Sequence, residues 1–541
     1  MNHLRTLFSF ALVCGLVVFG HAQERYLDEV FSSVTITSDT TYATNISIFP
    51  IIAGAATMPV PVPLEMDVYE PMGDTASMRP LILFAHTGTF FPPAVNGGPS
   101  GARTDSICVE FATRMAKRGY VVAVFTYRKG WNATSSNAEV KRKTILEAAY
   151  RGIHDARACV RYFRRNVAED GNGWRIDPDR IAMGGDGTGG YVTYGATYLK
   201  RFEQVFITKF IDFTDPMNPV PYVDTLQLGQ PYGLDSVALN IVNHPGYSSD
   251  FSMGFALGGA LGDSSWVEPN DPPFVSFHCY RDPFAPYAVG DVIEPVNDDV
   301  VIAQASGGFS TMTQSNAKGN QDIFKAVSWN DPFTMAQESN PQNNGLDGMF
   351  SFVTPDPMMG DTTCITSLPV PADTFQNWGS PWSWFNPAVY EATWNFVYAD
   401  AISNGQQITG AEAVCRASLG SPNDGAAAKI YIDSIVGYLS PRLAIALDLQ
   451  TSVGIEDELS QEIGFQAFPN PANQQLTLQV ADPAHPIQEV RLTDITGRTV
   501  YTQTGLSRTH TTIDRNNLPA GIYVLQVQVK GGTVVEKIQF D

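Results

Sequence analysis

Hydrophobic and polar positions follow two different patterns along this chain, and each pattern predicts a different kind of domain. In residues 23–450, continuous apolar runs at Leu81–Ala85 and Tyr120–Tyr127 are separated by helical spacing at Asp105–Arg118. Continuous apolar runs are typical of strands buried on both faces, and strand–helix–strand order predicts a parallel sheet covered by helices. From residue 464 the runs are short and alternating, with turns between them, which predicts a small all-β sandwich.

The same strand–helix order continues through residues 23–450. Further predicted strands are Leu64–Tyr69, Arg180–Met183, Phe255–Ala260, Phe274–Phe277 and Gly348–Val353, and further predicted helices are Lys143–Val167 and Ala426–Leu447, the last broken near Pro441. Phe202–Asn240 and Val289–Asn344 are rich in Gly, Asn and Pro, and we expect insertions there rather than core elements. The fold class is therefore α/β, with a doubly wound, mostly parallel sheet, and residues 451–463 are expected to be a linker.

The amino terminus and the charge balance limit where the protein works. Arg5, the apolar run Leu7–Phe19 and small residues before Gln23 indicate that residues 1–22 are a secretory signal peptide. A formal net charge of −21 over 541 residues argues against nucleic acid or an anionic membrane as partner. No other apolar stretch is long enough to span a bilayer, so we expect no transmembrane segment.

Five of the six cysteines lie after the predicted signal, and an odd count leaves at least one thiol free. Cys364 and Cys415 lie in loop-rich sequence and are the preferred disulfide pair, whereas Cys159 lies among apolar helix residues and is expected in the core. No Cys and His spacing is typical of zinc, so we expect neither a metal centre nor a cofactor.

The stretch Arg180–Gly195 (RIAMGGDGTGGYVTYG) is the centre of the first domain. A short apolar run, a glycine cluster and a helix-compatible segment predict the strained strand-to-helix turn known as a nucleophile elbow, with motif G-x-S-x-G. Gly185 and Gly189 stand at its flanking positions, where strand and helix nearly touch. The apex, which should be serine, is Gly187.

Two other interpretations of the glycines are weaker. Gly185, Gly187 and Gly190 also fit G-x-G-x-x-G, but that dinucleotide motif follows the first strand of its unit and is followed by an acid ending the next strand. Here the nearest later acid, Glu203, lies in a helical pattern. A plain glycine-rich turn is the other alternative.

Several motifs in residues 23–450 make this region resemble an α/β-hydrolase of the carboxylesterase and lipase kind. They are His86-Thr87-Gly88 after a buried strand, Arg118–Val122, Asp179-Arg180-Ile181 before the elbow, and Phe277–Tyr287. The resemblance implies an oxyanion-type pair of backbone N–H groups, one from Thr87 or Gly88 and one from Thr188. It also places the acidic member of a catalytic triad at Asp282.

The triad itself is incomplete. A serine hydrolase needs a nucleophile, a histidine and an acid, and in this family they follow in the order Ser, Asp or Glu, His. No histidine lies between Asp282 and the tail, where His485 is the next one. Asp347, in Asn344–Phe350, occupies the loop where the resemblance would place the base. Ser264 and Ser265 follow a predicted strand and are alternative hydroxyls, although turn residues capping a helix explain them as well.

The tail of the chain resembles the type A C-terminal sorting domain of the type IX secretion system, over residues 464–541. The matching segments are Phe468–Ala472, Leu492–Arg498, Leu518–Leu525 and Lys537-Ile538. This resemblance implies export through the periplasm to the cell surface or the medium, with the type IX machinery as partner. It does not bear on the chemistry of the first domain.

Three functions remain open. The leading hypothesis is a secreted, catalytically degenerate hydrolase fold that binds a small-molecule or glycan ligand, with the glycine-opened helix N-terminus as an anion site. The second is an active ester hydrolase that uses unconventional groups, such as water activated by Asp282 or Asp347. The third is a structural cell-surface protein. We also expect Asp263, Asp282 and Asp347 to meet over one crevice at the carboxyl ends of neighbouring strands.

Overall fold

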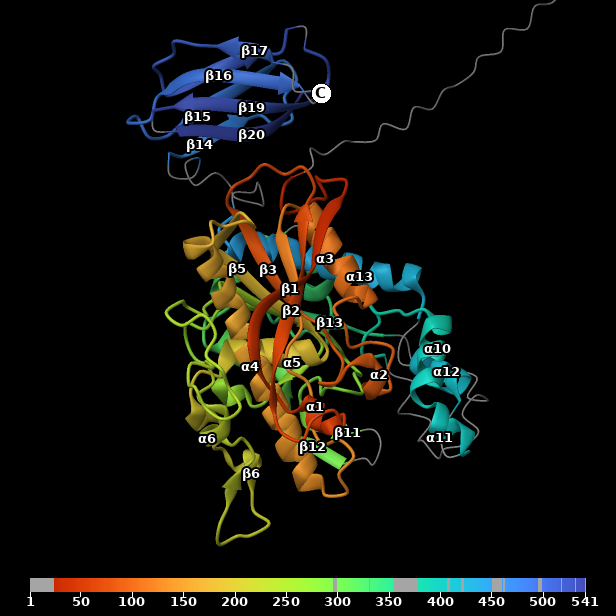
Figure 1. The fold of residues 1–541 in the computed structure, drawn as a ribbon. Helices are drawn as coiled ribbons and strands as arrows, with labels where there is room; N and C mark the ends of the chain where they lie inside the picture. Colours follow the sequence, from red (N-terminus) through yellow and green to blue (C-terminus); the bar gives the residue numbers. More distant parts are fainter. Residues whose placement is uncertain are drawn as a thin grey trace, which may run out of the picture. The chain divides into compact units, whose positions relative to one another are not determined.

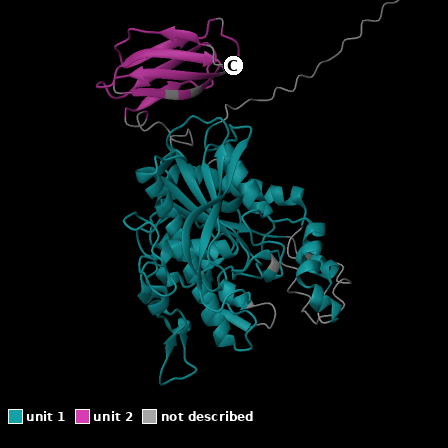
Figure 2. Cartoon of the chain, in the orientation of Figure 1, with its two compact units in different colours: residues 1–451 teal, residues 452–541 magenta. Residues whose placement is uncertain are grey.

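The computed structural model divides the chain into two compact units, residues 1–451 and 452–541 (Figure 2). The structure describes residues 24–294, 299–329, 331–354, 378–405, 409–419, 423–449, 460, 463–494, 499–516, 518–530 and 532–540. The predicted signal peptide, most of the predicted linker and Cys364 lie outside the described residues.

An eight-stranded mixed sheet forms the centre of the first unit (Figure 1). Its strand order is β1-β2-β4-β3-β5-β8-β10-β13. Strand β2 runs antiparallel to both of its neighbours, β1 and β4, and the six strands from β4 to β13 in this order are parallel to one another. The bounds are β1 Val34–Ser47, β2 Val60–Pro71, β3 Arg79–Ala85, β4 Val121–Phe125, β5 Ile176–Asp186, β8 Met253–Leu257, β10 Phe274–Cys279 and β13 Met349–Phe352. The predicted doubly wound, mostly parallel sheet is confirmed.

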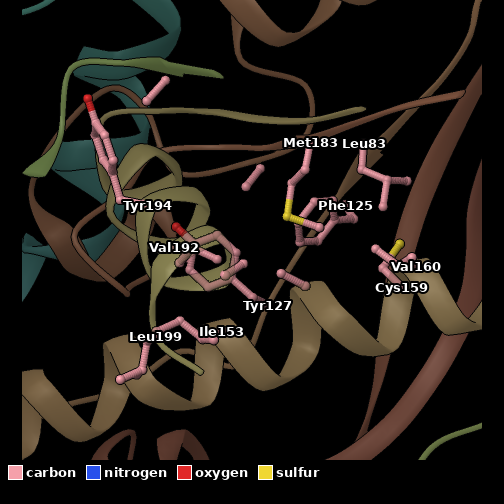
Figure 3. Packing of buried hydrophobic residues seen from close by; sticks show 14 of the residues in the cluster. Leu83, Phe125, Tyr127, Ile153, Cys159, Val160, Met183, Val192, Tyr194 and Leu199 are labelled. Atoms are coloured by element: carbon pink, nitrogen blue, oxygen red, sulfur yellow. The ribbon is translucent and has the colours of Figure 1, made fainter. Parts of the chain in front are cut away.

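Helices cover both faces of this sheet because the buried strands are apolar on both sides. On one face, Leu83 of β3 belongs to a core that includes Ile153 of α4 and Val192 of α5 (Figure 3). On the other face, the ring of Phe84 stacks on Phe111 of α3, with the ring centroids 4.7 Å apart. The helices of the unit are α1 Phe49–Ile52, α2 Pro93–Asn96, α3 Ser106–Lys117, α4 Ala138–Glu169, α5 Thr188–Tyr198, α6 Thr225–Leu228, α7 Gly308–Ala317, α8 Asp322–Lys325, α9 Pro332–Glu338, α10 Pro387–Val397, α11 Ala399–Ser403, α12 Gly410–Leu419 and α13 Gly425–Ala446.

Two sequence expectations about these elements are wrong. Helix α13 continues through Pro441, and the Arg442 guanidinium donates a hydrogen bond to the Tyr438 carbonyl in the same turn. Val289–Asn344 is also not only an insertion, because its helix α7 links β10 to β13 and buries Met312 against the sheet. Small Thr and Ser residues make up much of the buried face of α7, so its hydrophobic period is weak.

Shorter strands belong to the segments between the sheet elements. A small sheet contains β9 (Ala260–Leu261), β11 (Val289–Glu294) and β12 (Asp299–Gly307), and β6 (Ile211–Asp212) pairs with β7 (Val220–Pro221) in a hairpin. The hairpin lies in Phe202–Asn240, which contributes no strand to the eight-stranded sheet, as expected.

The second unit is the predicted all-β domain. Its antiparallel strands form a sheet of β14, β15 and β18 and a sheet of β17, β16, β19 and β20. The bounds are β14 Phe465–Phe468, β15 Gln475–Val480, β16 Ile487–Asp494, β17 Thr499–Gln503, β18 His510–Asp514, β19 Gly521–Val529 and β20 Gly532–Phe540. Alternate residues such as Leu476, Leu478, Leu525 and Val527 form its core.

The cysteines of the described chain fall into two groups. Cys108, Cys159 and Cys279 are buried free thiols, as expected for Cys159, and Cys415 is disulfide-bonded. The pairing of Cys415 with Cys364 stays a prediction. None of the helices in the described part of the chain combines the length and hydrophobicity that a membrane crossing requires.

Candidate functional site

The turn between β5 and α5 has a backbone that few residues other than glycine adopt. Gly187 stands between the last strand residue, Asp186, and the first helix residue, Thr188, with φ 51° and ψ −110°. A side chain at such an angle costs about 1–3 kcal/mol. This is the strained apex that an elbow requires, and here glycine adopts it without strain.

The flanking glycines are fixed by close backbone contacts. A Cβ on Gly185 would overlap the Gly189 carbonyl, and a Cβ on Gly189 would overlap the carbonyl of Ala85 in β3. Gly190 packs in the same way on the Gly258 carbonyl after β8. The helix therefore crosses the strands at a distance that excludes side chains, so these glycines are explained by packing alone.

The Thr87 side chain fills the space above the apex. A Cβ on Gly187 would overlap the Thr87 hydroxyl oxygen and lie 3.1 Å from Thr87 Cβ. The same hydroxyl accepts a hydrogen bond from the Thr188 backbone N–H at 3.3 Å. The backbone N–H of Thr89 in turn donates to the Thr188 hydroxyl oxygen at 2.8 Å.

These contacts change the picture of the oxyanion-type pair. The structure brings Thr87, Gly88 and Thr188 together, but the Thr188 N–H already has a partner inside the protein. Gly88 has φ 126°, and a Cβ there would lie 2.5 Å from the Gly101 Cα, so the segment after β3 is tightly packed. The Thr87 hydroxyl thus lies against one of the two N–H groups expected to hold a substrate carbonyl oxygen.

Asp282 follows β10 at the carboxyl edge of the sheet. Its Oδ1 accepts hydrogen bonds from the backbone N–H groups of Phe284 (2.7 Å) and Ala285 (3.1 Å), and its side chain is 4% exposed. Burial raises the pKa of the Asp282 carboxyl to about 7, assisted by the charge of Asp186. A Cβ on Gly379 would lie 2.8 Å from the same Oδ1, so the chain near residue 379 covers this carboxylate.

The histidine closest to Asp282 belongs to β10 itself. His278 Nε2 lies 3.6 Å from Asp282 Oδ2, and burial lowers the pKa of His278 to about 4. His278 Nδ1 accepts a hydrogen bond from the Gly308 N–H at 3.3 Å, and its Nε2 lies 3.2 Å from the Ala285 carbonyl. Both ring nitrogens therefore have structural partners, and the ring is neutral at physiological pH.

Asp347 is not brought to Asp282. It precedes β13, whose Met349 pairs with Ser276 near the start of β10, whereas Asp282 follows the end of β10. The two parallel strands advance about 3.3 Å per residue. Asp347 therefore lies at the amino ends of these strands and Asp282 at their carboxyl ends. The expectation that Asp347 lies over the same crevice as Asp282 is therefore wrong, because Asp347 precedes the amino end of β13.

Asp263, Ser264 and Ser265 form a capped turn rather than a reactive group. Asp263 accepts from the Ser265 N–H at 2.9 Å and pairs with Lys209 Nζ at 2.8 Å. The Ser264 N–H donates to the Ser306 hydroxyl at 2.9 Å. The expected crevice of three aspartates is therefore not formed, since Asp347 is absent from this edge. No group of three metal-ligating side chains occurs within the described residues.

Sequence reasoning missed the acid inside the elbow motif. Asp186 is buried, its Oδ1 accepts from the Trp382 indole N–H at 2.8 Å, and its Oδ2 has no hydrogen-bond partner among the described residues. Burial raises the pKa of Asp186 to about 7, although the Trp382 hydrogen bond lowers it. An acid between two glycines at the end of an apolar strand was the available signal.

The cavities among the described residues of the first unit include a polar one and an apolar one. A polar cavity of about 200 Å³ is lined by residues that include His86, Thr126 and Lys129. An apolar cavity of about 60 Å³ is lined by residues that include Tyr191 and Gly195 of α5 and Trp266. Tyr191 also donates its hydroxyl hydrogen to the Phe284 carbonyl at 3.2 Å, which ties α5 to the Asp282 loop.

The strand order, the glycine elbow after β5 and the acid after β10 together define an α/β-hydrolase fold. Residues 466–540 match the family described as the secretion system C-terminal sorting domain. The protein is therefore directed to the cell surface or outside the cell, and its tail implies handling by the type IX secretion machinery.

Solved structures that resemble this chain include esterases of the planctomycete Thermogutta terrifontis. Esterase 2 phosphorylated by paraoxon is 16% identical, with 47% of this chain and 73% of that chain covered and a TM-score of 0.26. The butyrate-bound esterase is 17% identical, with coverage of 42% and 70% and a TM-score of 0.26. Among curated protein sequences, none matches this chain.

Proposed function

We propose that this protein is an exported hydrolase fold that binds a small molecule or glycan and does not cleave esters by a serine triad. The observation that carries the proposal is the Thr87 hydroxyl, which occupies the space where the nucleophile's side chain would begin. The site therefore differs from an esterase by more than one missing serine, because its neighbour has taken the vacated volume.

Each part of the serine-hydrolase mechanism is affected. The nucleophile is replaced by Gly187, and the sequence holds no histidine between Cys279 and Ala484 that could take a proton. Loss of nucleophile or base costs several orders of magnitude in rate even where binding persists. The Thr188 N–H, which would stabilise an oxyanion, is hydrogen-bonded to Thr87.

Hydrolysis by water activated at Asp282 is supported less well. A general base must reach its water through an accessible oxygen. Asp282 Oδ1 already accepts two backbone hydrogen bonds, and the side chain is 96% buried, as its 4% exposure shows. Asp347 lies at the opposite end of the parallel strands from Asp282 and cannot assist it.

A fluorophosphonate probe and p-nitrophenyl esters test the proposal. The wild-type protein should show no covalent labelling and no turnover above a Gly187→Ala control. The variant Thr87→Gly/Gly187→Ser restores the space and the hydroxyl but adds no base. Its ester turnover should therefore stay very low, because a positioned general base contributes at least about a hundredfold to the rate. Labelling of the wild type, or turnover that Asp282→Asn removes, would overturn the proposal and favour the unconventional hydrolase.

A further inference from the structure

The polar cavity is not lined by Thr87, Gly187 or Thr188 of the elbow. Its lining residues come from the end of β3, the end of β4 and the loop before α3, and they are His86, Ala102, Arg103, Thr104, Thr126 and Lys129. Its volume of about 200 Å³ exceeds the roughly 150 Å³ of a protein cavity that holds benzene. A ring-sized small molecule therefore fits it.

Lys129 presents an amine to this cavity without a carboxylate partner. Its Nζ donates to the Gly101 carbonyl at 2.8 Å and forms no ion pair with any described residue. Burial lowers the pKa of Lys129 to about 8. A lysine ammonium has three N–H donors, so two of them remain for a ligand or water.

The nearest acid to Lys129 is directed elsewhere. Asp105 Oδ2 accepts the backbone N–H groups of Gly101 (2.7 Å) and Ala102 (3.1 Å), and its burial raises its pKa to about 6. Its charge favours the ammonium form of Lys129, whereas the charge of Arg103 disfavours that form. Asp105 does not line the cavity.

Arg103 is held by acids that lie behind it. It pairs with Asp39, with Glu65 at 3.4 Å and with Asp67 at 3.2 Å. None of these carboxylates lines the cavity, and no other Asp or Glu of the described chain does so. The lining therefore contains no carboxylate and two cationic side chains, of which Arg103 is already paired with three acids and Lys129 is not.

His86 adds no charge to this lining. Its ring is fully buried, burial holds its pKa well below the ordinary value, and Lys129 adds to that shift. Nδ1 faces the Thr87 carbonyl, which can only accept, so Nδ1 carries the hydrogen and Nε2 accepts from the Thr126 hydroxyl at 3.1 Å. With a neutral imidazole and no carboxylate in the lining, the Lys129 ammonium favours an anionic ligand.

We propose that this cavity binds a small organic carboxylate of about the size of benzoate, with the carboxylate held by the Lys129 ammonium. The charge of the lining selects the anion, and the volume admits a ring. The proposal gives a ligand class to the binding role above and rests on that role, but it concerns a different set of atoms from the elbow.

Calorimetric titration of the full chain with benzoate, and with benzamide as its neutral counterpart, tests this site. Benzoate should bind at least about tenfold more tightly than benzamide, a difference of about 1.4 kcal/mol. Its affinity should fall as pH rises through the Lys129 pKa of about 8, because the ammonium form is then lost. Sulfate, titrated in parallel, shows whether an inorganic oxyanion alone satisfies the amine.

Variants and footprinting locate the binding. Lys129→Met should weaken benzoate binding by at least about tenfold, whereas Lys325→Met, which removes an exposed lysine paired with Asp322, should not. In the wild type, benzoate should protect Lys129 but not Lys325 from acetylation, a readout that needs no variant to fold. Equal binding of benzamide, unprotected Lys129 or tighter binding of sulfate would overturn the carboxylate site. Esterase activity with intact benzoate binding would instead refute the catalytic proposal alone.

Discussion

Two consecutive residues belong to different regions of the molecule: Thr87 contacts the elbow at Gly187, and His86 lines the cavity at Lys129. The two regions differ in how their polar groups are hydrogen-bonded. At the elbow, Thr87 turns its hydroxyl onto the Thr188 N–H. At the cavity, His86 Nε2 accepts a hydrogen bond from the Thr126 hydroxyl. The Lys129 ammonium donates one hydrogen bond, to the Gly101 carbonyl, and has two further N–H donors. Successive side chains of an extended chain point to opposite sides, so one strand end serves two different environments.

Under the proposed function, this difference separates the elbow from the place where a ligand binds. The glycines of the elbow are required by backbone packing, so they persist whether or not a nucleophile is present. The Thr87 and Thr188 hydroxyls beside them accept internal hydrogen bonds, whereas Asp186 Oδ2 has no partner among the described residues. Burying a charge without a partner is costly, and the Lys129 ammonium, which no carboxylate of the described residues pairs with, is such a charge at the cavity, where a ligand can compensate it.

The largest expected effect tests whether packing alone fixes the elbow. Gly189→Ala places a Cβ on the Ala85 carbonyl, which is backbone and cannot rotate away. We expect a loss of about 3 kcal/mol in unfolding free energy, at the upper end of overpacking costs, measured by urea denaturation. Gly173→Ala is the matched control, since no atom lies within 4 Å of its added Cβ. Equal stability of the two variants would remove the packing explanation.

A second prediction concerns the buried acid of the elbow motif. The folded-state pKa of Asp186, about 7, is above the ordinary value of 3.8. Its contribution to the free energy of unfolding is therefore fully present at low pH and is lost as pH rises from about 4 through 7, because the unfolded chain releases this proton at a lower pH than the folded protein does. In Asp186→Asn, the fall in unfolding free energy between pH 5 and pH 8 should shrink by about 2 kcal/mol, since one pKa unit corresponds to about 1.4 kcal/mol.

Thermal unfolding across this pH range measures that effect. Asp282, whose pKa is raised in the same direction, remains in the variant and should preserve part of the slope. The fully exposed Asp448 provides the control, and Asp448→Asn should leave the pH profile unchanged. A profile of Asp186→Asn identical to wild type would mean that Asp186 is ionised in the folded protein.

Much of the fold could be predicted from the sequence, because strongly patterned segments decide it. Apolar runs such as Leu81–Ala85 and the alternating strands of the tail are set by local hydrophobicity, and the structure confirms both. Helix α7 was missed because Thr, Ser and Gly make up most of its buried face beside Met312, and these residues give no clear hydrophobic period. The expectation that Asp347 lies over the same crevice as Asp282 was wrong because Asp347 precedes the strand Gly348–Val353 and so lies at its amino end, as the pairing of Met349 with Ser276 requires.

The site was predictable only in its backbone. The glycine spacing located the elbow, and the histidine inventory showed that the triad is incomplete. The filling of the apex by Thr87 depends on a side chain 100 residues away in the chain, and no local pattern encodes that contact. The Lys129 cavity likewise depends on three segments that meet only in the folded sheet.

The smallest expected effect is the coupling between Thr87 and the apex, which a double-mutant cycle isolates. Gly187→Ala pays backbone strain at φ 51° and also meets the Thr87 hydroxyl, whereas in a Thr87→Gly background only the strain remains. The two substitutions should therefore be non-additive by about 1 kcal/mol in urea unfolding, within the range for residues in contact. Additive losses would show that the Thr87 side chain moves aside at no cost. In that case the apex is open, and the contrast between a closed elbow and an open cavity no longer holds.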